Sequence, residues 1–219
     1  DWSSDVCSSD LNEQGVQKMS VLVGREAPDF TAPSILGNGD VKADFNLHEA
    51  KNGKYAVIFF YPLDFTFVCP SELIAFDHRI AEFTKRNVEV IGVSIDSHWT
   101  HNAWRNTAVN DGGIGAVKYT MVGDMKQSIT QDYGVQVPGG APALRASFLV
   151  DKDNIVQHQV VNNLSLGRNI DEMLRMVDAL QFTEEHGEVC PAGWKDGDEG
   201  MKASPDGVAS YLASHEGDL

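Results

Sequence analysis

The chain has 219 residues, of which 42% are hydrophobic and 22% charged, and its formal net charge is −15. This length is sufficient for one domain with a sizeable hydrophobic core. A surface this acidic argues against nucleic acid and against an anionic membrane as the main partner. The sequence also lacks the run of about 18 apolar residues that a membrane-spanning helix needs.

Residues 1–18 are predicted to be a non-native extension. Residues 1–11, DWSSDVCSSDL, can be back-translated into a string that resembles a common sequencing-adapter oligonucleotide. Residues 14–16 can be encoded by a string containing the ribosome-binding-site-like AAGGAG, so we expect a bacterial protein that begins at Met19. Without these 18 residues, which include four acids and one lysine, the net charge is −12 over 201 residues. No secretory signal follows Met19, which predicts a cytoplasmic protein.

The first elements expected after Met19 are an extended segment at residues 23–30 and a hairpin-type turn at residues 37–40. The apolar run Tyr55–Tyr61 then predicts a buried strand. After a short turn, Cys69 precedes Pro70, a residue that is common in the first turn of helices. The next apolar residues recur at roughly helical spacing and predict one amphipathic helix; they are Leu73, Phe76, Ile80 and Phe83.

Cys69 is the candidate nucleophile because it lies at the N-terminus of this helix. There the free backbone N–H groups and the helix dipole favour a thiolate over a thiol. A lone cysteine beside a hydrophobic strand is more often a small core residue. Its neighbours favour catalysis: the hydroxyl of Thr66 can reach the sulfur, Pro62 can exclude water, and Glu72 can hold an arginine.

The pattern Pro62-x-x-x-Thr66-x-x-Cys69, inside FFYPLDFTFVCPSE, resembles the active-site motif of the peroxiredoxins. More narrowly, it is similar to the typical two-cysteine group, which includes alkyl hydroperoxide reductase C and thioredoxin peroxidases. The resemblance implies an α/β protein with an elaborated thioredoxin fold, in which helices flank a central mixed β-sheet. It also implies a thiol-dependent peroxidase that needs no metal or organic cofactor.

The middle of the chain continues the α/β pattern. The strand Val88–Ser94 completes a strand–helix–strand unit with parallel strands. A helix is expected from His98 to about Thr107, with His98 and His101 solvated, because the histidines show no metal-ligand spacing. The glycine-rich loop at residues 111–115 lacks the Gly-Lys-Ser/Thr of a phosphate site and resembles the loop of easily over-oxidised peroxiredoxins. A strand at residues 117–122 and a helix at residues 126–133 follow.

Residues 145–151 and 155–161 are predicted to form a β-hairpin. Arg145 heads its first strand, and a lone arginine is usually a solvated surface charge. The segment around it, ALRASFL, resembles the distal active-site arginine segment of the family, which implies that Arg145 lies against the Cys69 sulfur. Asn169, followed three residues later by Glu172, is expected to start a helix with one apolar face.

The composition changes after Phe182, and we predict a peroxidase domain at residues 19–183 and a C-terminal tail at residues 184–219 with a short helix that Ser204 caps. The tail segment GEVCPAGW resembles the resolving-cysteine motif of the typical two-cysteine group. Over-oxidation-prone members carry Tyr-Phe in the last helix, where this chain has Tyr211-Leu212. The missing aromatic ring predicts a tail that unpacks more readily.

These resemblances imply a complete reaction. Cys69 attacks hydrogen peroxide or a small alkyl hydroperoxide and becomes a sulfenic acid, which Cys190 of a partner subunit converts into a disulfide. Arg145 holds Cys69 ionised, Glu72 orients Arg145, and Thr66 and Pro62 shape the site. A thioredoxin or a flavoprotein reductase recycles the disulfide, and the working unit is a homodimer in a ring of five dimers. A peroxide sensor or redox relay and a holdase chaperone stay open as alternatives, and only the holdase role is independent of Cys69.

Overall fold

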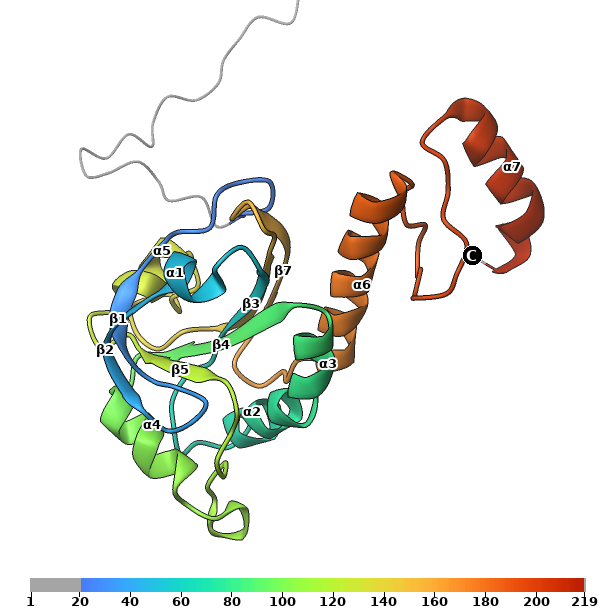
Figure 1. The fold of residues 1–219 in the computed structure, drawn as a ribbon. Coiled ribbons are helices and arrows are strands. Elements are labelled where there is room, and N and C mark those ends of the chain that lie inside the picture. Colours follow the sequence, from blue (N-terminus) through green and yellow to red (C-terminus); the bar gives the residue numbers. More distant parts are fainter. Residues whose placement is uncertain (1–20, 219) are drawn as a thin grey trace, which may run out of the picture.

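The computed structural model describes residues 21–218, so the predicted extension at residues 1–18 and the start at Met19 lie outside the described residues. Its centre is a mixed seven-stranded sheet in the order β2-β1-β5-β4-β3-β6-β7 (Figure 1). β3, β4 and β5 run parallel, and the other neighbours are antiparallel. The strands are β1 (Thr31–Ile35), β2 (Val41–Asn46), β3 (Tyr55–Phe60), β4 (Val88–Ser94), β5 (Thr120–Gly123), β6 (Arg145–Val150) and β7 (Val156–Asn162).

Helices cover both faces of this sheet. They are α1 (Leu47–Lys51), α2 (Cys69–His78), α3 (Ile80–Lys85), α4 (His98–Arg105), α5 (Ser128–Asp132), α6 (Ile170–His186) and α7 (Pro205–His215), with short 3-10 turns at Val109–Asp111 and Glu216–Asp218. In β3 alternate side chains point to opposite faces. Val57 and Phe59 pack in the cluster that α2, α3, α4 and α6 complete, whereas Ile58 and Phe60 pack with α1 and α5. Because both faces are covered, β3 is apolar throughout, as its sequence predicted.

Several predicted elements are present with nearly the expected bounds. β4 matches the predicted strand, and β6 and β7 form the predicted hairpin. The Asn169 side chain caps α6 by accepting from the backbone N–H groups of Asp171 and Glu172, and Ser204 caps α7 by accepting from Gly207. The predicted α/β architecture, a mixed sheet flanked by helices, is confirmed.

The single helix predicted after Pro70 is wrong, because the structure contains two helices there. α2 ends at His78, and the backbone of Arg79, with φ −107° and ψ 4°, separates it from α3. The guanidinium of Arg79 donates at 2.7 Å to Asp171 at the start of α6. Phe76 and Phe83 are both buried, one on each side of the break. The apolar spacing therefore identified the buried face correctly but not the interruption in the backbone.

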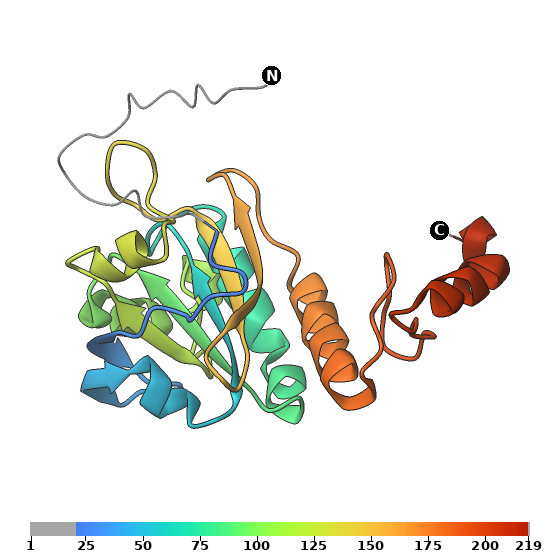
Figure 2. The ribbon, with the colours of Figure 1, turned by 90° about the horizontal axis from the view of Figure 1, so that it is seen from above.

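The C-terminal part forms an arm that leaves the sheet. α6 packs beside α2 and α3 at its start, and α7 lies beyond the other end of α6, away from the sheet (Figures 1 and 2). The domain boundary that we predict after residue 183 falls inside α6, which continues to His186. Gly187, with φ +67°, then ends this helix in the left-handed conformation that glycine adopts without steric cost.

Candidate active site

The candidate nucleophile lies at the end of the loop that connects β3 to α2. Cys69 is the first residue of α2, and its side chain is fully buried. The loop between them reverses direction at Phe65, whose φ of +53° is uncommon for a residue with a large side chain. This turn brings Thr66 back over the start of the helix. The local chain path therefore builds half of the site before any distant residue is added.

Thr66 and Pro62 lie in the loop between β3 and Cys69. The Thr66 hydroxyl lies 3.0 Å from the Cys69 sulfur and 2.7 Å from the carbonyl oxygen of Leu63. One hydroxyl proton serves one acceptor at a time, so Thr66 donates to a thiolate or accepts from a thiol as the state of Cys69 requires. Pro62 is buried and adds no N–H group to the pocket.

Arg145 and Glu72 complete the contact with the sulfur. Arg145 begins β6, which is paired with β3, and its Nη1 lies 3.3 Å from the Cys69 sulfur. The same nitrogen donates to Glu72 Oε2 at 2.8 Å, and Nε donates to the carbonyl of Leu164 at 2.6 Å. Glu72 lies on α2 one turn after Cys69. The structure thus connects Cys69 directly to Thr66 and Arg145, and Glu72 through Arg145.

Arg168 is a second arginine at this site that the sequence analysis missed. Its backbone N–H and its Nε donate to Glu72 Oε1 at 2.9 and 2.8 Å, and its Nη2 donates to Oε2 at 3.0 Å. Its Nη1 also donates to the carbonyls of Phe60 at 2.8 Å and Ala146 at 2.6 Å, which ties β3 and β6 to α2. No local pattern separates Arg168 from a surface arginine, since only the fold brings it to Glu72.

The charges of this cluster reinforce one another. Burial acts to raise the pKa of Glu72, but the hydrogen bonds and charge of Arg168 and the charge of Arg145 outweigh it and lower that pKa. Burial likewise acts to lower the pKa of Arg145, but the bonds and charges of Cys69 and Glu72 raise it above its ordinary value. Glu72 therefore remains a carboxylate and Arg145 remains a cation at neutral pH.

The expectation that His101 is solvated is wrong. Its ring is fully buried, with Nδ1 2.7 Å from Asp64 Oδ2 and Nε2 3.1 Å from the carbonyl of Val122. His98, three residues earlier on α4, is half-buried beside Trp99. His101 lies three residues before the buried Trp104, and this spacing places both on the inner face of the helix. The three-residue spacing from Trp104 was the feature of the sequence that could have predicted the burial of His101.

Cys190 is not at this site within its own chain. Its sulfur lies 3.5 Å from the carbonyl of Ala179 and 3.7 Å from the hydroxyl of Thr183, on the later part of α6. Cys69 lies near the start of α6, where Arg168 precedes Ile170. At a rise of about 1.5 Å per residue, Ala179 lies roughly 13 Å further along the helix than Ile170. Both cysteines are free thiols.

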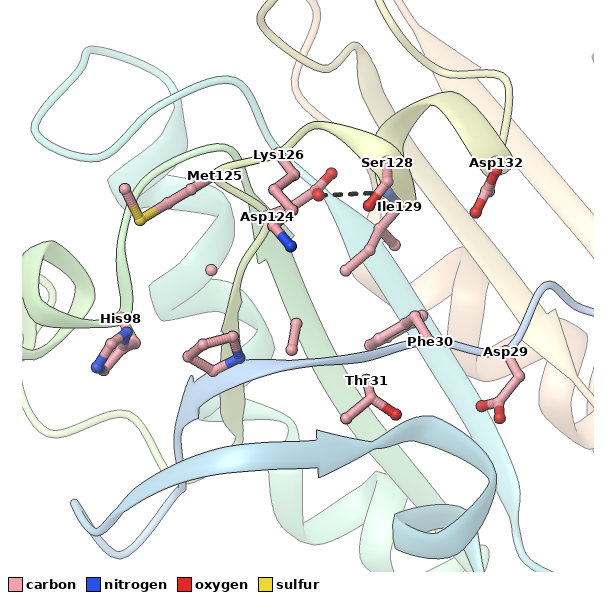
Figure 3. A pocket seen from close by; sticks show the side chains of 13 residues that line it. Asp29, Phe30, Thr31, His98, Asp124, Met125, Lys126, Ser128, Ile129 and Asp132 are labelled. Carbon is pink, nitrogen blue, oxygen red and sulfur yellow. Dashed lines mark hydrogen bonds between the residues drawn. The ribbon is translucent and has the colours of Figure 1, made fainter.

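A separate cavity of about 370 Å³ opens beyond the ends of β4 and β5 (Figure 3). Phe30, His98 and Met125 are among its lining residues, and none of the residues around the Cys69 sulfur is. The buried carboxylate in its wall, Asp124, already accepts hydrogen bonds from the backbone of Ile129 and from Thr130. Asp124 therefore caps α5 and is engaged within the fold.

Within residues 21–218, no group of three or more histidine, cysteine or acidic side chains is arranged to hold a metal ion. Over the same residues, no helix combines the length and the apolar character needed to cross a membrane.

The sequence model of the AhpC/TSA family matches residues 23–159, and that of the C-terminal domain of 1-Cys peroxiredoxin matches residues 179–214. Alkyl hydroperoxide reductase C of Helicobacter pylori (strain ATCC 700392 / 26695) is 57% identical over 194 residues, which is 88% of this chain and 96% of the relative. Peroxiredoxin-1 of Gallus gallus is 46% identical over 195 residues, which is 89% of this chain and 97% of the relative.

Solved structures agree with these relatives. Reduced 2-Cys peroxiredoxin of Plasmodium vivax superposes with a TM-score of 0.85 at 47% identity, covering 89% of this chain and all of that one. AhpC of Enterococcus faecalis gives 0.70 at 35% identity, covering 78% and 99%. The fold is therefore the thioredoxin-like α/β fold of the peroxiredoxins. The chain belongs to the AhpC/TSA family of peroxiredoxins, and it is an enzyme of the peroxidase class.

The cluster around Glu72 generates a prediction about stability. Glu72→Gln keeps the shape of the side chain but leaves two buried arginines without their anion, and we expect the free energy of unfolding at pH 7 to fall by about 3–5 kcal/mol. Because the folded pKa of Glu72 is lowered, its contribution is fully present above its unfolded value, near the ordinary 4.5, and is lost as the pH falls through the folded pKa.

Denaturant unfolding of both proteins between pH 7 and pH 3 measures this difference, which should shrink as the pH falls below about 4. The control is Glu82→Gln, which removes an exposed carboxylate on the neighbouring α3 that pairs with Arg86. It should leave the unfolding midpoint nearly unchanged. An equal loss in the two variants at pH 7, or a difference that does not depend on pH, would contradict the assignment of a buried ion cluster.

Proposed function

We propose that this enzyme reduces hydrogen peroxide and small alkyl hydroperoxides with Cys69 as the peroxidatic nucleophile. The observation that carries the proposal is the environment of one sulfur: Cys69 begins α2, with Arg145 Nη1 at 3.3 Å and the Thr66 hydroxyl at 3.0 Å. A cation and a hydroxyl donor both stabilise a thiolate, which is the reactive form of cysteine. The family membership of the chain supports the same assignment.

The first step oxidises the sulfur and reduces the peroxide. The Cys69 thiolate attacks the terminal oxygen of the hydroperoxide, an S–O bond forms, and the O–O bond breaks. The leaving alkoxide or hydroxide takes up a proton and departs as an alcohol or as water, while Cys69 becomes a sulfenic acid. The Arg145 guanidinium stabilises the negative charge that moves along the breaking bond. Thr66 orients the peroxide oxygens, and Pro62 keeps bulk water from the pocket.

The second step uses Cys190 of a partner subunit. Its thiol attacks the sulfenic sulfur of Cys69, an S–S bond forms, and water leaves. A disulfide needs Cα atoms within about 7 Å. Cys190 follows α6 and lies against the later part of that helix, which argues against closure within one chain, and an arm that leaves the sheet suits delivery to a neighbour. A thioredoxin or a flavoprotein reductase then supplies the two electrons that restore both thiols.

The surface of the chain supports assembly as a homodimer and, further, as a ring of five dimers. β7 is the edge strand of the sheet and offers its outer backbone groups to another strand. Phe67, in the loop before Cys69, is 97% exposed and Trp99, on α4, is 62% exposed, which is unusual for aromatic side chains that stay in water. The negative charge disfavours nucleic acid and anionic membranes as partners, and we place the protein in the cytoplasm.

The two-cysteine cycle can be tested on a non-reducing denaturing gel. In the full chain with Cys7→Ser, one equivalent of hydrogen peroxide should produce a band of dimer mass. The same band should be absent when Cys69→Ser or Cys190→Ser is added. A parent protein that stays at monomer mass with unchanged free thiols would show that Cys69 is not peroxidatic. A monomer that loses both thiols would show instead that the disulfide closes within one chain.

The last helix generates a prediction about over-oxidation. Leu212 on α7 is 42% exposed within its own chain, so its apolar side chain is available to a partner subunit. Leu212→Phe adds apolar area and should hold the arm in place for longer, which exposes the sulfenic acid to a second peroxide. We expect inactivation during turnover at several-fold lower peroxide concentrations. Leu212→Ile is the control of equal size, and equal inactivation of all three proteins would contradict the role of this contact.

A further inference from the structure

A buried cluster of ionisable side chains lies behind the loop that carries Thr66. The side chains of His101 and Asp64 are 0% and 1% exposed, and His101 Nδ1 lies 2.7 Å from Asp64 Oδ2. Tyr61 donates its hydroxyl to the other carboxylate oxygen, Oδ1, at 2.9 Å. The peroxidase chemistry proposed above uses none of these three groups. A buried ionisable pair of this kind needs a physical reason.

The hydrogen bonds fix the number of protons in the cluster. Nε2 of His101 lies 3.1 Å from the carbonyl oxygen of Val122, which can only accept, so Nε2 carries a proton. One more proton lies between Nδ1 and the Asp64 carboxylate. The pair is therefore neutral overall, either as imidazolium with carboxylate or as imidazole with carboxylic acid. Burial raises the pKa of Asp64, and His101 opposes that rise. Burial also raises the pKa of Tyr61 well above its ordinary value, so Tyr61 remains a donor.

Asp64 is held at its backbone as well as at its side chain. Its N–H donates to Asp96 Oδ2 at 2.9 Å, and the same oxygen accepts from the hydroxyl of Ser94 at 2.8 Å. Ser94 is the last residue of β4, and His101 lies on α4. Two separate elements therefore hold Asp64 in place. The residue that follows is Phe65, the point at which the loop turns with a φ of +53°.

This turn determines where the Thr66 hydroxyl lies. A non-glycine residue at positive φ is strained and persists only where its surroundings hold it. Here the ring of Phe65 packs against Trp104 at 5.6 Å, while Asp64 is fixed on the other side of the bend. One residue after Phe65, the Thr66 hydroxyl reaches Cys69 at 3.0 Å. A shift of about 1 Å in such a contact is enough to lower a rate substantially.

We infer that the His101–Asp64 pair is a positioning element of the peroxidatic site: it holds the turn at Phe65 so that the Thr66 hydroxyl meets the Cys69 sulfur. The inference rests on the proposed role of Cys69. Neither His101 nor Asp64 touches the reacting atoms, so their effect on the reaction passes through Thr66. The neutral hydrogen-bonded geometry, rather than a net charge, is what the site requires.

A double-mutant cycle tests the inferred positioning role. The measured quantity is the rate constant of Cys69 oxidation by hydrogen peroxide, determined by stopped flow in the folded full chain. Asp64→Ala should lower the rate constant about 10-fold in the wild-type background. It should lower the rate constant less than about 2-fold when Thr66→Val is already present, because the contact that it disturbs is gone. Asp64→Asn should stay within about 3-fold of wild type, since its amide can donate to a neutral imidazole and its carbonyl can accept from Tyr61.

The controls separate this role from general destabilisation. His98→Ala, three residues away on the same helix, should leave the rate constant unchanged. If Asp64→Ala does not fold, the double variant Asp64→Asn/His101→Leu removes the imidazole without stranding a buried carboxylate, and it should show the same coupling to Thr66→Val.

Equal losses in the two backgrounds, or an Asp64→Asn as slow as Asp64→Ala, would overturn the inference. If Cys69→Ser keeps full peroxidase activity, it is the proposed function that fails instead.

Discussion

The site depends on a charge balance beneath one sulfur. Glu72 accepts hydrogen bonds from Arg145 and from three N–H groups of Arg168, so two cations share one carboxylate in a buried region. That leaves one positive charge in excess, and an uncompensated buried charge is costly. The sulfur of Cys69 lies 3.3 Å from Arg145. The same cluster that holds β3, β6 and α2 together therefore places a cation beside the sulfur that we propose as the nucleophile.

The residues that place the charge beside the sulfur also stabilise the fold. Arg168 satisfies carbonyl groups at the ends of β3 and β6 while it neutralises Glu72. Its guanidinium also lies 5.4 Å from the ring centre of Phe59, so it contacts the core through a cation–π interaction. Removing Glu72, Arg145 or Arg168 would disturb the pairing of β3 with β6, the start of α2 and the surroundings of the Cys69 sulfur together. The charge beside the Cys69 sulfur is placed by the packing of the domain rather than by a flexible loop.

The sequence predicted the parts of the site that local pattern determines. An apolar run followed by Cys69-Pro70 placed the cysteine at a helix start, and the motif placed Thr66 beside it. Arg168 and the burial of His101 were missed because periodicity shows which face is buried but not which distant side chain meets it. The break at Arg79 was missed for a related reason: an ion pair with Asp171, 92 residues away, accompanies a backbone change that apolar spacing does not report.

That break bears on how a packed cysteine can move. The proposed disulfide with Cys190 of another subunit requires Cys69 to leave its buried position, which means unwinding the first turn of α2. The N-cap of α2, Val68, makes no side-chain capping bond, so the backbone N–H groups of this turn lack the side-chain acceptor that a Ser, Thr, Asp or Asn cap would provide. Because α2 ends before Arg79, and Arg79 is tied to α6, unwinding need not spread into α3. The movement that the proposed reaction demands can therefore be confined to one short helix, while the sheet that holds Arg145 stays in place.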